Sequence, residues 1–475
     1  MTRTIETDIL VIGAGSGGLS VAAGASQLGV DATLLEGGEM GGDCLNTGCV
    51  PSKAFLRAAK AAHEVRHTGR FGVNGHEPAI DFPAVKAHVR KVVDGIAPMD
   101  SVERFEGLGV RVIREYGRFV DDHTVVAGDY RITARKIVIA TGSRAAIPPI
   151  PGLDQVPYHT NETIFAQMER PAHLIVIGAG PIGIEMAQAH RRLGSAVTVL
   201  DIGRMMPRDD QELVDILRNK LRAEGVDLRE EINISRVEQS GNGIAVVLDD
   251  NGTENLIEGS DLLVAAGHSP NLEKLDLDAA GVTHNRKGVV VDARLRSNKR
   301  HIYAVGDVAG GPQFTHIAGY HAGVVIKNLL FKLPSKVDYS ALPWVTYTDP
   351  ELAQVGLTEA QALAEFGKGN FEIARWSFHE NDRAQAEGKA EGLVKIIIVR
   401  GRVRGASIIG PQAGELLQLW CLAVQERTKI SKIASMIVPY PTLAEVNKRA
   451  AGSYFTPKLF STRSRKIVQF LQKFG

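Results

Sequence analysis

The sequence predicts an α/β fold with two similar strand–turn–helix–strand units and a separate C-terminal α+β domain. Two segments carry this prediction: "DILVIGAGSGGLSVAAGASQLGVDATLLE" at 8–36 and "HLIVIGAGPIGIEMAQAHRRLGSAVTVLD" at 173–201. Each is typical of a short apolar strand, a glycine-rich turn, an alanine-rich helix and a second strand that ends in an acidic residue. From residue 342 the pattern changes to alternating strands followed by helices, without such a turn.

Both turns follow the pattern GxGxxG. The glycines are Gly13, Gly15 and Gly18 in the first turn and Gly178, Gly180 and Gly183 in the second. In such a turn the first glycine permits a tight bend, the second lets the backbone approach a pyrophosphate, and the third lets helix and strand pack closely. The terminal carboxylate, Glu36 or Asp201, lies 23 positions after the first glycine in both units and can accept hydrogen bonds from a ribose. One copy can arise for packing alone, but two copies at equal spacing predict two Rossmann-like dinucleotide-binding domains.

The composition indicates a globular protein of several domains, because 475 residues exceed one ordinary core. The formal net charge of +1 gives no bulk attraction to nucleic acid, so we predict no nucleic-acid partner. Three cysteines cannot cross-link so long a chain, which is typical of a reducing compartment. The N-terminal residues run directly into an apolar strand without the pattern of a signal peptide, and we expect a cytoplasmic location.

Two of the cysteines, Cys44 and Cys49, lie five positions apart in "GGDCLNTGCVPSK" at 41–53. In a regular helix, residues five apart have Cα atoms about 8 to 9 Å apart. A disulfide requires less than about 7 Å. A bond between the two cysteines therefore requires distorted backbone, which Gly48 and Pro51 favour.

Four interpretations of this pair stay open: a metal site, a structural bridge, two inert thiols or a reversible redox disulfide. A metal site needs more ligands at suitable spacing, and none lies nearby in the sequence, so we predict no metal-binding residues. A structural bridge is disfavoured in a reducing compartment. Inert thiols do not explain the glycines and proline around them. The redox disulfide is the favoured interpretation.

This stretch, with both glycine turns, "ATG" at 140–142, "YAVGDV" at 303–308 and the C-terminal domain, resembles the flavin-dependent pyridine nucleotide-disulfide oxidoreductases. Within that family it is similar to dihydrolipoamide dehydrogenase and mercuric reductase, and the resemblance covers essentially the whole chain. It implies an FAD-binding domain of residues 1–150 and 271–341, an NAD(P)-binding domain of 151–270, and an interface domain of 342–475 that forms a homodimer.

The resemblance assigns the first unit to FAD. Glu36 is then expected on the adenosine ribose, Lys53 beside the flavin, and Asp307 on the ribityl chain. The other FAD-lining residues that it implies are Gly42, Gly117, Thr141, Gly142 and His316. The second unit is assigned to the nicotinamide nucleotide, with Gly267 lining the same site.

The resemblance also implies catalytic roles. Cys49 is expected as the thiolate nearer the flavin, and Cys44 as the interchange thiol that attacks the substrate. Glu185 is expected to pair with Lys53 beneath the nicotinamide. Electrons then pass between NAD(P)H and an outside acceptor through the flavin and the Cys44–Cys49 disulfide. A thiolate beside Lys53 should have a lowered pKa.

The choice between NAD and NADP depends on Asp201. Its carboxylate favours ribose hydroxyls and repels a 2′-phosphate, so NAD is the expected nucleotide. Arg204 and Arg208 lie just downstream and can soften this rule, which leaves NADP open, although solvated loop charges are the favoured interpretation.

The chain departs from the family near its C-terminus. Disulfide-reducing relatives carry a His and a Glu there as acid and base, whereas this chain has "VPYPTLAEV" at 438–446, with Tyr440 in place of the His and Glu445 retained. An unperturbed tyrosine titrates near about 10, against about 6.5 for histidine, so it is a poor general base at neutral pH. General acid–base help is typically worth about 10²–10⁴-fold. We therefore expect weak oxidation of dihydrolipoamide.

Mercuric reductase resembles the chain in having this tyrosine, and a soft metal ion bound by thiolates needs little proton transfer. The tail at 453–475 lacks the vicinal cysteines of that family, so the substrate stays open among a small disulfide, a dithiol and a metal ion. The favoured function is a mercuric reductase-like reduction of an electrophilic acceptor. The alternatives are a dihydrolipoamide dehydrogenase and a non-enzymatic flavoprotein redox sensor.

Two further features are predicted outside the site. Cys421 lies in the apolar run "LLQLWCLAVQE" and is expected in the core. The last segment, "RKIVQFLQKF", places apolar residues on one helical face, with basic residues elsewhere. They are Ile467, Phe470, Leu471 and Phe474. Packing on the partner subunit is favoured over contact with acidic lipid.

Overall fold

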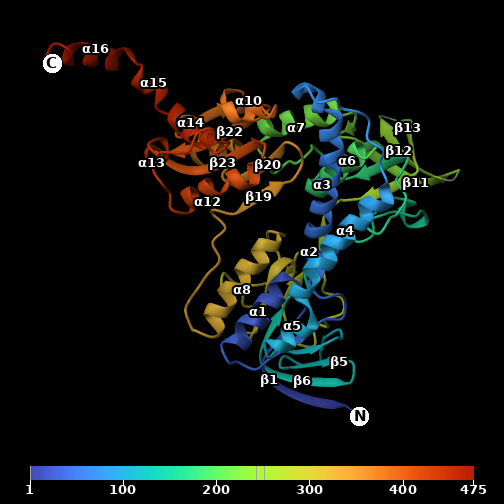
Figure 1. Ribbon diagram of the computed structural model, residues 1–475. Coiled ribbons are helices and arrows are strands. Elements are labelled where there is room, and N and C mark those ends of the chain that lie inside the picture. Colours follow the sequence, from blue (N-terminus) through green and yellow to red (C-terminus); the bar gives the residue numbers. More distant parts are fainter. Residues whose placement is uncertain (1, 242, 251, 475) are drawn as a thin grey trace. The chain divides into compact units, whose positions relative to one another are not determined.

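A computed structural model describes residues 2–241, 243–250 and 252–474 of the chain (Figure 1). The chain divides into two compact units, each assembled from segments far apart in sequence. Unit 1 consists of Met1–Ala59, Ala79–Gly178 and Ile234–Val337, and unit 2 of Lys60–Pro78, Ala179–Asn233 and Asp338–Gly475.

The main sheet of unit 1 has the strand order β3-β2-β1-β6-β5-β4, and β18 also pairs with β6. The strands are β1 (Arg3–Ile12), β2 (Ala32–Leu35), β3 (Arg111–Ile113), β4 (Arg118–Phe119), β5 (Thr124–Ala127), β6 (Tyr130–Ile139) and β18 (Ile302–Ala304). Strands β3, β2, β1, β6 and β18 pair in parallel. Strand β5 pairs antiparallel with β6 on one side and with β4 on the other. The last four residues of β1, 9–12, are apolar and buried, as expected of a parallel strand covered on both faces.

The first glycine turn leads from β1 into helix α1 (Ser16–Gln27), which packs against α8 (Thr315–Leu329). Four further helices follow the turn in sequence. They are α2 (Gly42–Asn46), the start of α3 (Cys49–Arg66), α4 (Phe82–Ile96) and α5 (Val102–Gly107). Three small sheets also belong to this unit: β7 (Ser143–Ala145) with β15 (His268–Pro270), β16 (His284–Asn285) with β17 (Gly288–Val289), and β11 (Asn233–Ser240) with β12 (Gly243–Asp250) and β13 (Thr253–Gly259).

The second strand–turn–helix–strand segment, 173–201, has the same order of elements as the first, 8–36. Strand β8 (His173–Ile177) leads through the second glycine turn into α6 (Pro181–Arg192), then β9 (Ala196–Leu200), α7 (Gln211–Ala223) and β10 (Asp227–Arg229). Strand β8 pairs in parallel with β14 (Asp261–Val264), and β9 pairs in parallel with β10. Helices α1 and α6 both have 12 residues. The predicted pair of Rossmann-like units is confirmed.

The C-terminal part of unit 2 is an antiparallel sheet with helices, as predicted. Its strand order is β19-β20-β23-β22-β21, with bounds β19 (Pro343–Thr346), β20 (Glu351–Gly356), β21 (Glu372–Ser377), β22 (Leu393–Val399) and β23 (Arg402–Gly410). The helices are α9 (Glu359–Phe366), α10 (Asp382–Ala386), α11 (Ala413–Leu416), α12 (Gln418–Gln425), α13 (Ile430–Ala434) and α14 (Glu445–Ser453). Trp420 is fully buried in the core of this part. Cys421, which was expected in the core, is half-buried and packs against it.

The chain ends in α15 (Thr456–Leu459) and α16 (Thr462–Leu471), which extend outward from α14 (Figure 1). The predicted helix is present, and its apolar side chains are exposed in the single chain. Among the described helices, none combines the length and apolar character needed to cross a bilayer.

Candidate active site

The cysteine pair lies where two helices meet. Cys44 is in α2 and Cys49 is the first residue of α3, so Thr47 and Gly48 form a break between them. The backbone is therefore distorted between the cysteines, as the spacing predicts. Both residues are free thiols, so the structure describes the dithiol form of the pair.

The two thiols differ in acidity. The Cys44 thiol donates a hydrogen bond to Cys49, which lowers the pKa of Cys49 to about 6 against the opposing effect of burial. The Thr315 hydroxyl, 3.3 Å from the Cys49 sulfur, and the charge of Lys53 lower it further. The same pairing, with burial, raises the pKa of Cys44. At neutral pH the pair is therefore a thiolate at Cys49 and a thiol at Cys44.

Alkylation of the reduced enzyme should follow this difference. Only the thiolate reacts, so the rate of Cys49 modification by iodoacetamide should rise with pH to a plateau with a midpoint near about 6. Cys421 is the internal comparison, because burial raises its pKa to about 11. Mass spectrometry of the labelled peptides measures both rates. A Cys49 midpoint near the ordinary thiol value of about 8.5 would contradict the assignment.

The two glycine turns have nearly the same backbone. Gly13 and Gly178 adopt φ of +108° and +114°, and a Cβ on either would overlap a backbone carbonyl, of Ala140 or Ala265 respectively. Gly15 and Gly180, the residues before α1 and α6, have open space where a Cβ would project. Neither helix has a side-chain cap or an acidic residue in its first turn. Each helix start therefore leaves N–H groups for an anion.

Each predicted ribose-binding carboxylate forms hydrogen bonds that join the end of its strand to the glycine turn. Glu36 accepts hydrogen bonds from the backbone N–H of Ala14 (2.6 Å) and of Gly38 (2.7 Å). Asp201 accepts from the equivalent Ala179 (2.6 Å) and Gly203 (2.7 Å). A carboxylate has about four acceptor positions, so both keep capacity for ribose hydroxyls.

Several predicted FAD residues lie around Asp307, in the turn after β18. Burial raises the pKa of Asp307, whose carboxylate accepts a 2.6 Å hydrogen bond from the Ser143 hydroxyl. Gly142 has open space beside it, as Gly267 has near the second turn. The Thr141 hydroxyl instead donates to the carbonyl of Asn271 (2.8 Å).

Three further residues predicted to line FAD also lie in unit 1. The hydrogens of Gly117 face Leu35 and Val125, Gly42 lies against Gly15, and His316 stacks on Phe314 with ring centroids 5.2 Å apart. Sequence reasoning missed Ser143 and Thr315, whose only signal is that they directly follow Gly142 and precede His316 in the chain.

The remaining predicted catalytic residues belong to unit 2. Glu185 is buried in α6, and its carboxylate accepts a 2.8 Å hydrogen bond from the backbone N–H of Tyr347. Glu445 begins α14 and pairs with Arg449 at 2.8 Å. Because Lys53 lies in unit 1, its pairing with Glu185 stays a prediction.

Tyr440 is exposed, and its hydroxyl donates a 2.7 Å hydrogen bond to the carboxylate of Asp382. This bond and the negative charge of Asp382 raise the pKa of Tyr440. The side chain is thus a neutral hydrogen-bond donor and cannot accept a proton at neutral pH.

One group of metal-ligating residue types was not foreseen. Asp122, His123 and His301 have ligand atoms within 4.8 Å of one another. The two imidazoles, however, stack with centroids 3.9 Å apart and planes 6° apart, and nitrogen lone pairs lie in the ring plane. One ion cannot lie in both planes. The carboxylate of Asp122 is also paired with Lys299 at 3.1 Å, so this arrangement does not favour a cation.

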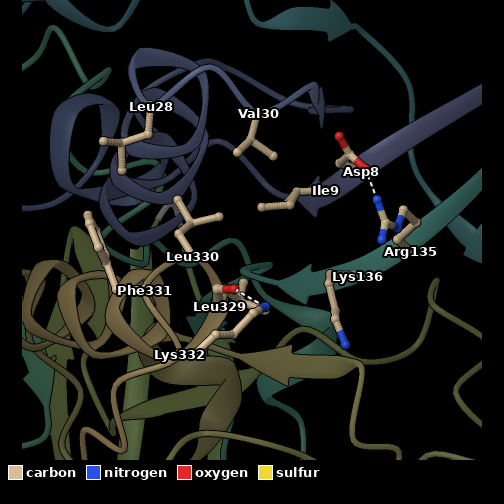
Figure 2. Close-up of a pocket in the computed structure, with 10 residues that line it drawn as sticks. All are labelled: Asp8, Ile9, Leu28, Val30, Arg135, Lys136, Leu329, Leu330, Phe331 and Lys332. Atoms are coloured by element: carbon tan, nitrogen blue, oxygen red, sulfur yellow. Dashed lines mark hydrogen bonds and ion pairs between the residues drawn. The ribbon is translucent and has the colours of Figure 1, made fainter.

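Figure 2 shows a cavity of about 400 Å³ that contains none of the predicted site residues. Its apolar wall comes from β1, the segment after α1 and the end of α8 with the residues that follow it. Three cations line it, of which Arg135 pairs with Asp8 (3.0 Å) and Lys332 donates to the carbonyl of Leu329 (2.6 Å). The glycine turns and the cysteine pair remain the candidate site.

Comparison with known proteins agrees with this geometry. A model of the pyridine nucleotide-disulphide oxidoreductases matches residues 7–322, and a model of the dimerisation domain of that family matches residues 342–451. The chain belongs to the pyridine nucleotide-disulphide oxidoreductase family. The family match covers both glycine turns and the cysteine pair.

Its relatives include two kinds of enzyme. A mercuric reductase of Staphylococcus aureus is 33% identical over 457 residues, which cover 95% of this chain and 83% of the relative. A dihydrolipoyl dehydrogenase of Geobacillus stearothermophilus is 33% identical over 462 residues, covering 94% and 96%. Among solved structures, the HOCl-induced flavoprotein disulfide reductase RclA of Escherichia coli has a TM-score of 0.85 at 26% identity, covering 94% and 99%. Its Cu(II) complex has a TM-score of 0.84 at 26% identity, covering 93% and 99%.

This pyridine nucleotide-disulphide oxidoreductase is therefore an FAD-dependent, NAD(P)H-linked enzyme, which sets aside the non-enzymatic sensor. The match to the dimerisation domain indicates a homodimer, and the substrates are of the disulfide or mercuric-ion type. The residues of unit 1 fit FAD. The uncapped start of α1 beside Gly15 suits its pyrophosphate, and the partly buried Asp307 suits a hydroxyl-bearing chain.

Proposed function

We propose that this enzyme reduces an electrophilic acceptor, a soft metal ion above all, at the Cys44–Cys49 dithiol, with electrons from NAD(P)H. The observation that carries the proposal is the hydrogen bond from Tyr440 to Asp382. Oxidation of a dithiol substrate requires a base that takes a proton from it. Tyr440 stays protonated because its pKa is raised, and its hydroxyl donates a hydrogen bond to Asp382, so it does not supply that base.

Reduction of a bound acceptor makes smaller demands on proton transfer. The Cys49 thiolate is ionised at neutral pH without help from another subunit. The Cys44 proton lies in the hydrogen bond to Cys49, so Cys49 can take it as Cys44 attacks a sulfur or binds a metal ion. FAD, when bound, supplies the two-electron relay from the nicotinamide to the pair.

The other roles are part of the same proposal. Lys53 stabilises the Cys49 thiolate. Glu36 and Asp307 hold FAD, and Asp201 selects NAD. Glu185 and Glu445 act beside the nicotinamide and the acceptor. The enzyme works as a cytoplasmic homodimer, with the exposed apolar face of α16 packed on the partner subunit. The mercuric reductase relatives and the Cu(II) complex of RclA support a metal-ion acceptor.

An acceptor panel tests the proposal. Steady-state turnover is measured with NADH and with NADPH, against Hg(II), Cu(II), glutathione disulfide, lipoamide, dihydrolipoamide with NAD, and quinones. We expect metal ions to exceed dihydrolipoamide and NADH to exceed NADPH. Faster oxidation of dihydrolipoamide than reduction of any acceptor would contradict the proposal.

The second candidate, a dihydrolipoamide dehydrogenase, is favoured by the retention of Glu445 and by relatives of that name. It has a direct test. The substitution Tyr440→His should restore a base and raise dihydrolipoamide oxidation by about 10²-fold or more. The gain should follow the titration of a histidine, near about pH 6.5. The absence of any gain would refute the role given to the missing base.

A further inference from the structure

The residue immediately before the first cysteine is acidic, and its side chain is held across the turn that joins the pair. One carboxylate oxygen of Asp43 accepts hydrogen bonds from the Thr47 hydroxyl and from the Asn161 amide, the latter at 2.9 Å. The other oxygen lies 3.0 Å from where a Cβ on Gly48 would be. Asn161 is buried, so this anchor is fixed. The carboxylate is therefore held against the Thr47–Gly48 turn that joins the helices of Cys44 and Cys49.

The charge of Asp43 is not neutralised. Both of its hydrogen-bond donors are uncharged, and among the described residues it forms no ion pair. Its side chain is exposed in the single chain. Hydrogen bonds from uncharged donors such as Thr47 and Asn161 fix the position of a carboxylate but leave its negative charge in place.

The field of this carboxylate reaches both sulfurs. It raises the pKa of Cys44 and the pKa of Cys49. The opposing positive charge, Lys53, acts on Cys49. Lys53 therefore opposes Asp43 at Cys49, and no positive charge is among the groups that shift the pKa of Cys44, the thiol assigned to the substrate.

We propose that Asp43 is a specificity-determining residue that makes the dithiol select cationic acceptors and reject anionic ones. This inference rests on the proposed function and narrows its acceptor class. A soft metal cation is attracted to the pair, and so is a disulfide with amino groups. A disulfide that carries carboxylates is repelled, because a like charge near a reacting group disfavours its approach.

A disulfide substrate is reduced to two thiols in two successive exchange steps. Cys49 takes the Cys44 proton as the Cys44 sulfur attacks one substrate sulfur and the substrate S–S bond breaks. Cys49 then gives this proton to the first departing sulfur, which leaves as a thiol, and Cys49 is again a thiolate. The Cys49 thiolate then attacks the Cys44 sulfur, and the second thiol leaves. The Cys44–Cys49 pair loses two electrons and becomes a disulfide, and the substrate gains these two electrons. The two departing thiols take one proton from the pair and one from water.

Three disulfides of similar size and different charge test the selection: cystamine (dication), 2-hydroxyethyl disulfide (neutral) and dithiodiglycolate (dianion). In the wild-type holoenzyme we expect kcat/KM to fall in that order. Asp43→Asn should lower the cystamine-to-dithiodiglycolate ratio by about tenfold, since one unit charge near the pair is removed. High salt should also lower the cystamine-to-dithiodiglycolate ratio of the wild type, because it screens the charge of Asp43. The matched control is Asp129→Asn, which changes the net charge equally at the exposed turn between β5 and β6.

A second measurement does not depend on turnover. The reduced holoenzyme is treated with cationic, neutral and anionic methanethiosulfonates, and the rate of thiol modification is recorded for wild type and Asp43→Asn. A cation-to-anion ratio that is the same in both proteins would overturn the role of Asp43. A ratio that falls in this assay while turnover ratios stay constant would overturn the proposed function instead, because electrons would then bypass the pair.

Discussion

Replacing Cys49 by serine is expected to lower turnover with every disulfide or metal-ion acceptor by more than about 10³-fold, because a residue that acts as one half of a catalytic unit cannot be spared. Serine keeps the size of the side chain and a hydrogen-bonding group for Thr315, but it is not ionised at neutral pH and cannot form a disulfide. Cys44→Ser should cost a similar factor. Steady-state kinetics with NADH and the acceptor panel measure both losses.

The control for these variants is Cys421→Ser, in the helix α12 of unit 2. Its thiol is half-buried against the apolar core, and burial raises its pKa to about 11, so it is neither ionised nor part of the site. We expect this variant to turn over like the wild type. NADH oxidation in the Cys49→Ser protein without an acceptor separates nucleotide binding from the thiol step. Full turnover by Cys49→Ser would remove the pair from the electron path.

The substitution Lys395→Met is expected to lower the free energy of unfolding by about 3–5 kcal/mol, because it breaks a buried ion pair from one side. Lys395 lies in β22 with its side chain 2% exposed, and its ammonium contacts three carboxylates of unit 2: Asp210 (2.9 Å), Glu212 (2.7 Å) and Glu359 (2.5 Å). Methionine fills a similar volume but leaves the buried Asp210 without its cation. Arg375 contacts only Glu212 and Glu359 among these carboxylates.

Denaturant titration followed by far-UV circular dichroism measures this loss. Lys432→Met is the matched control, since Lys432 is exposed on α13 and a surface substitution usually changes stability by less than about 0.5 kcal/mol. Unit 2 should unfold at lower denaturant in Lys395→Met only. Equal midpoints for the two variants would mean that the cluster contributes nothing to stability.

The repeat of the two glycine turns could be predicted residue by residue because its causes are local. A few adjacent residues set the positive φ at Gly13 and at Gly178 and leave each helix start without a side-chain cap. Because the glycines have the same spacing in both segments, the two turns have nearly the same backbone conformation. The break between Cys44 and Cys49 was predictable for the same reason, since the length of a helical turn and the reach of a disulfide are fixed by covalent geometry.

The substitution at Tyr440 was also visible in the sequence, but its partner was not. Nothing in "VPYPTLAEV" indicates Asp382, which lies 58 residues earlier, accepts a hydrogen bond from the tyrosine and raises its pKa. The stacked histidines His123 and His301 were missed because their pairing depends on two turns that the chain brings together from distant positions.

By itself, the sequence determined the family, the two dinucleotide-binding units, the cysteine pair and the missing histidine, all of which depend on residue type and short-range spacing. Only the tertiary structure decided the chemistry of the pair. Thr315 reaches Cys49 from 266 residues away, and Asn161 fixes Asp43 from 118 residues away. Acidity and charge at a site follow from the distance between groups in space, and a sequence records only their distance along the chain.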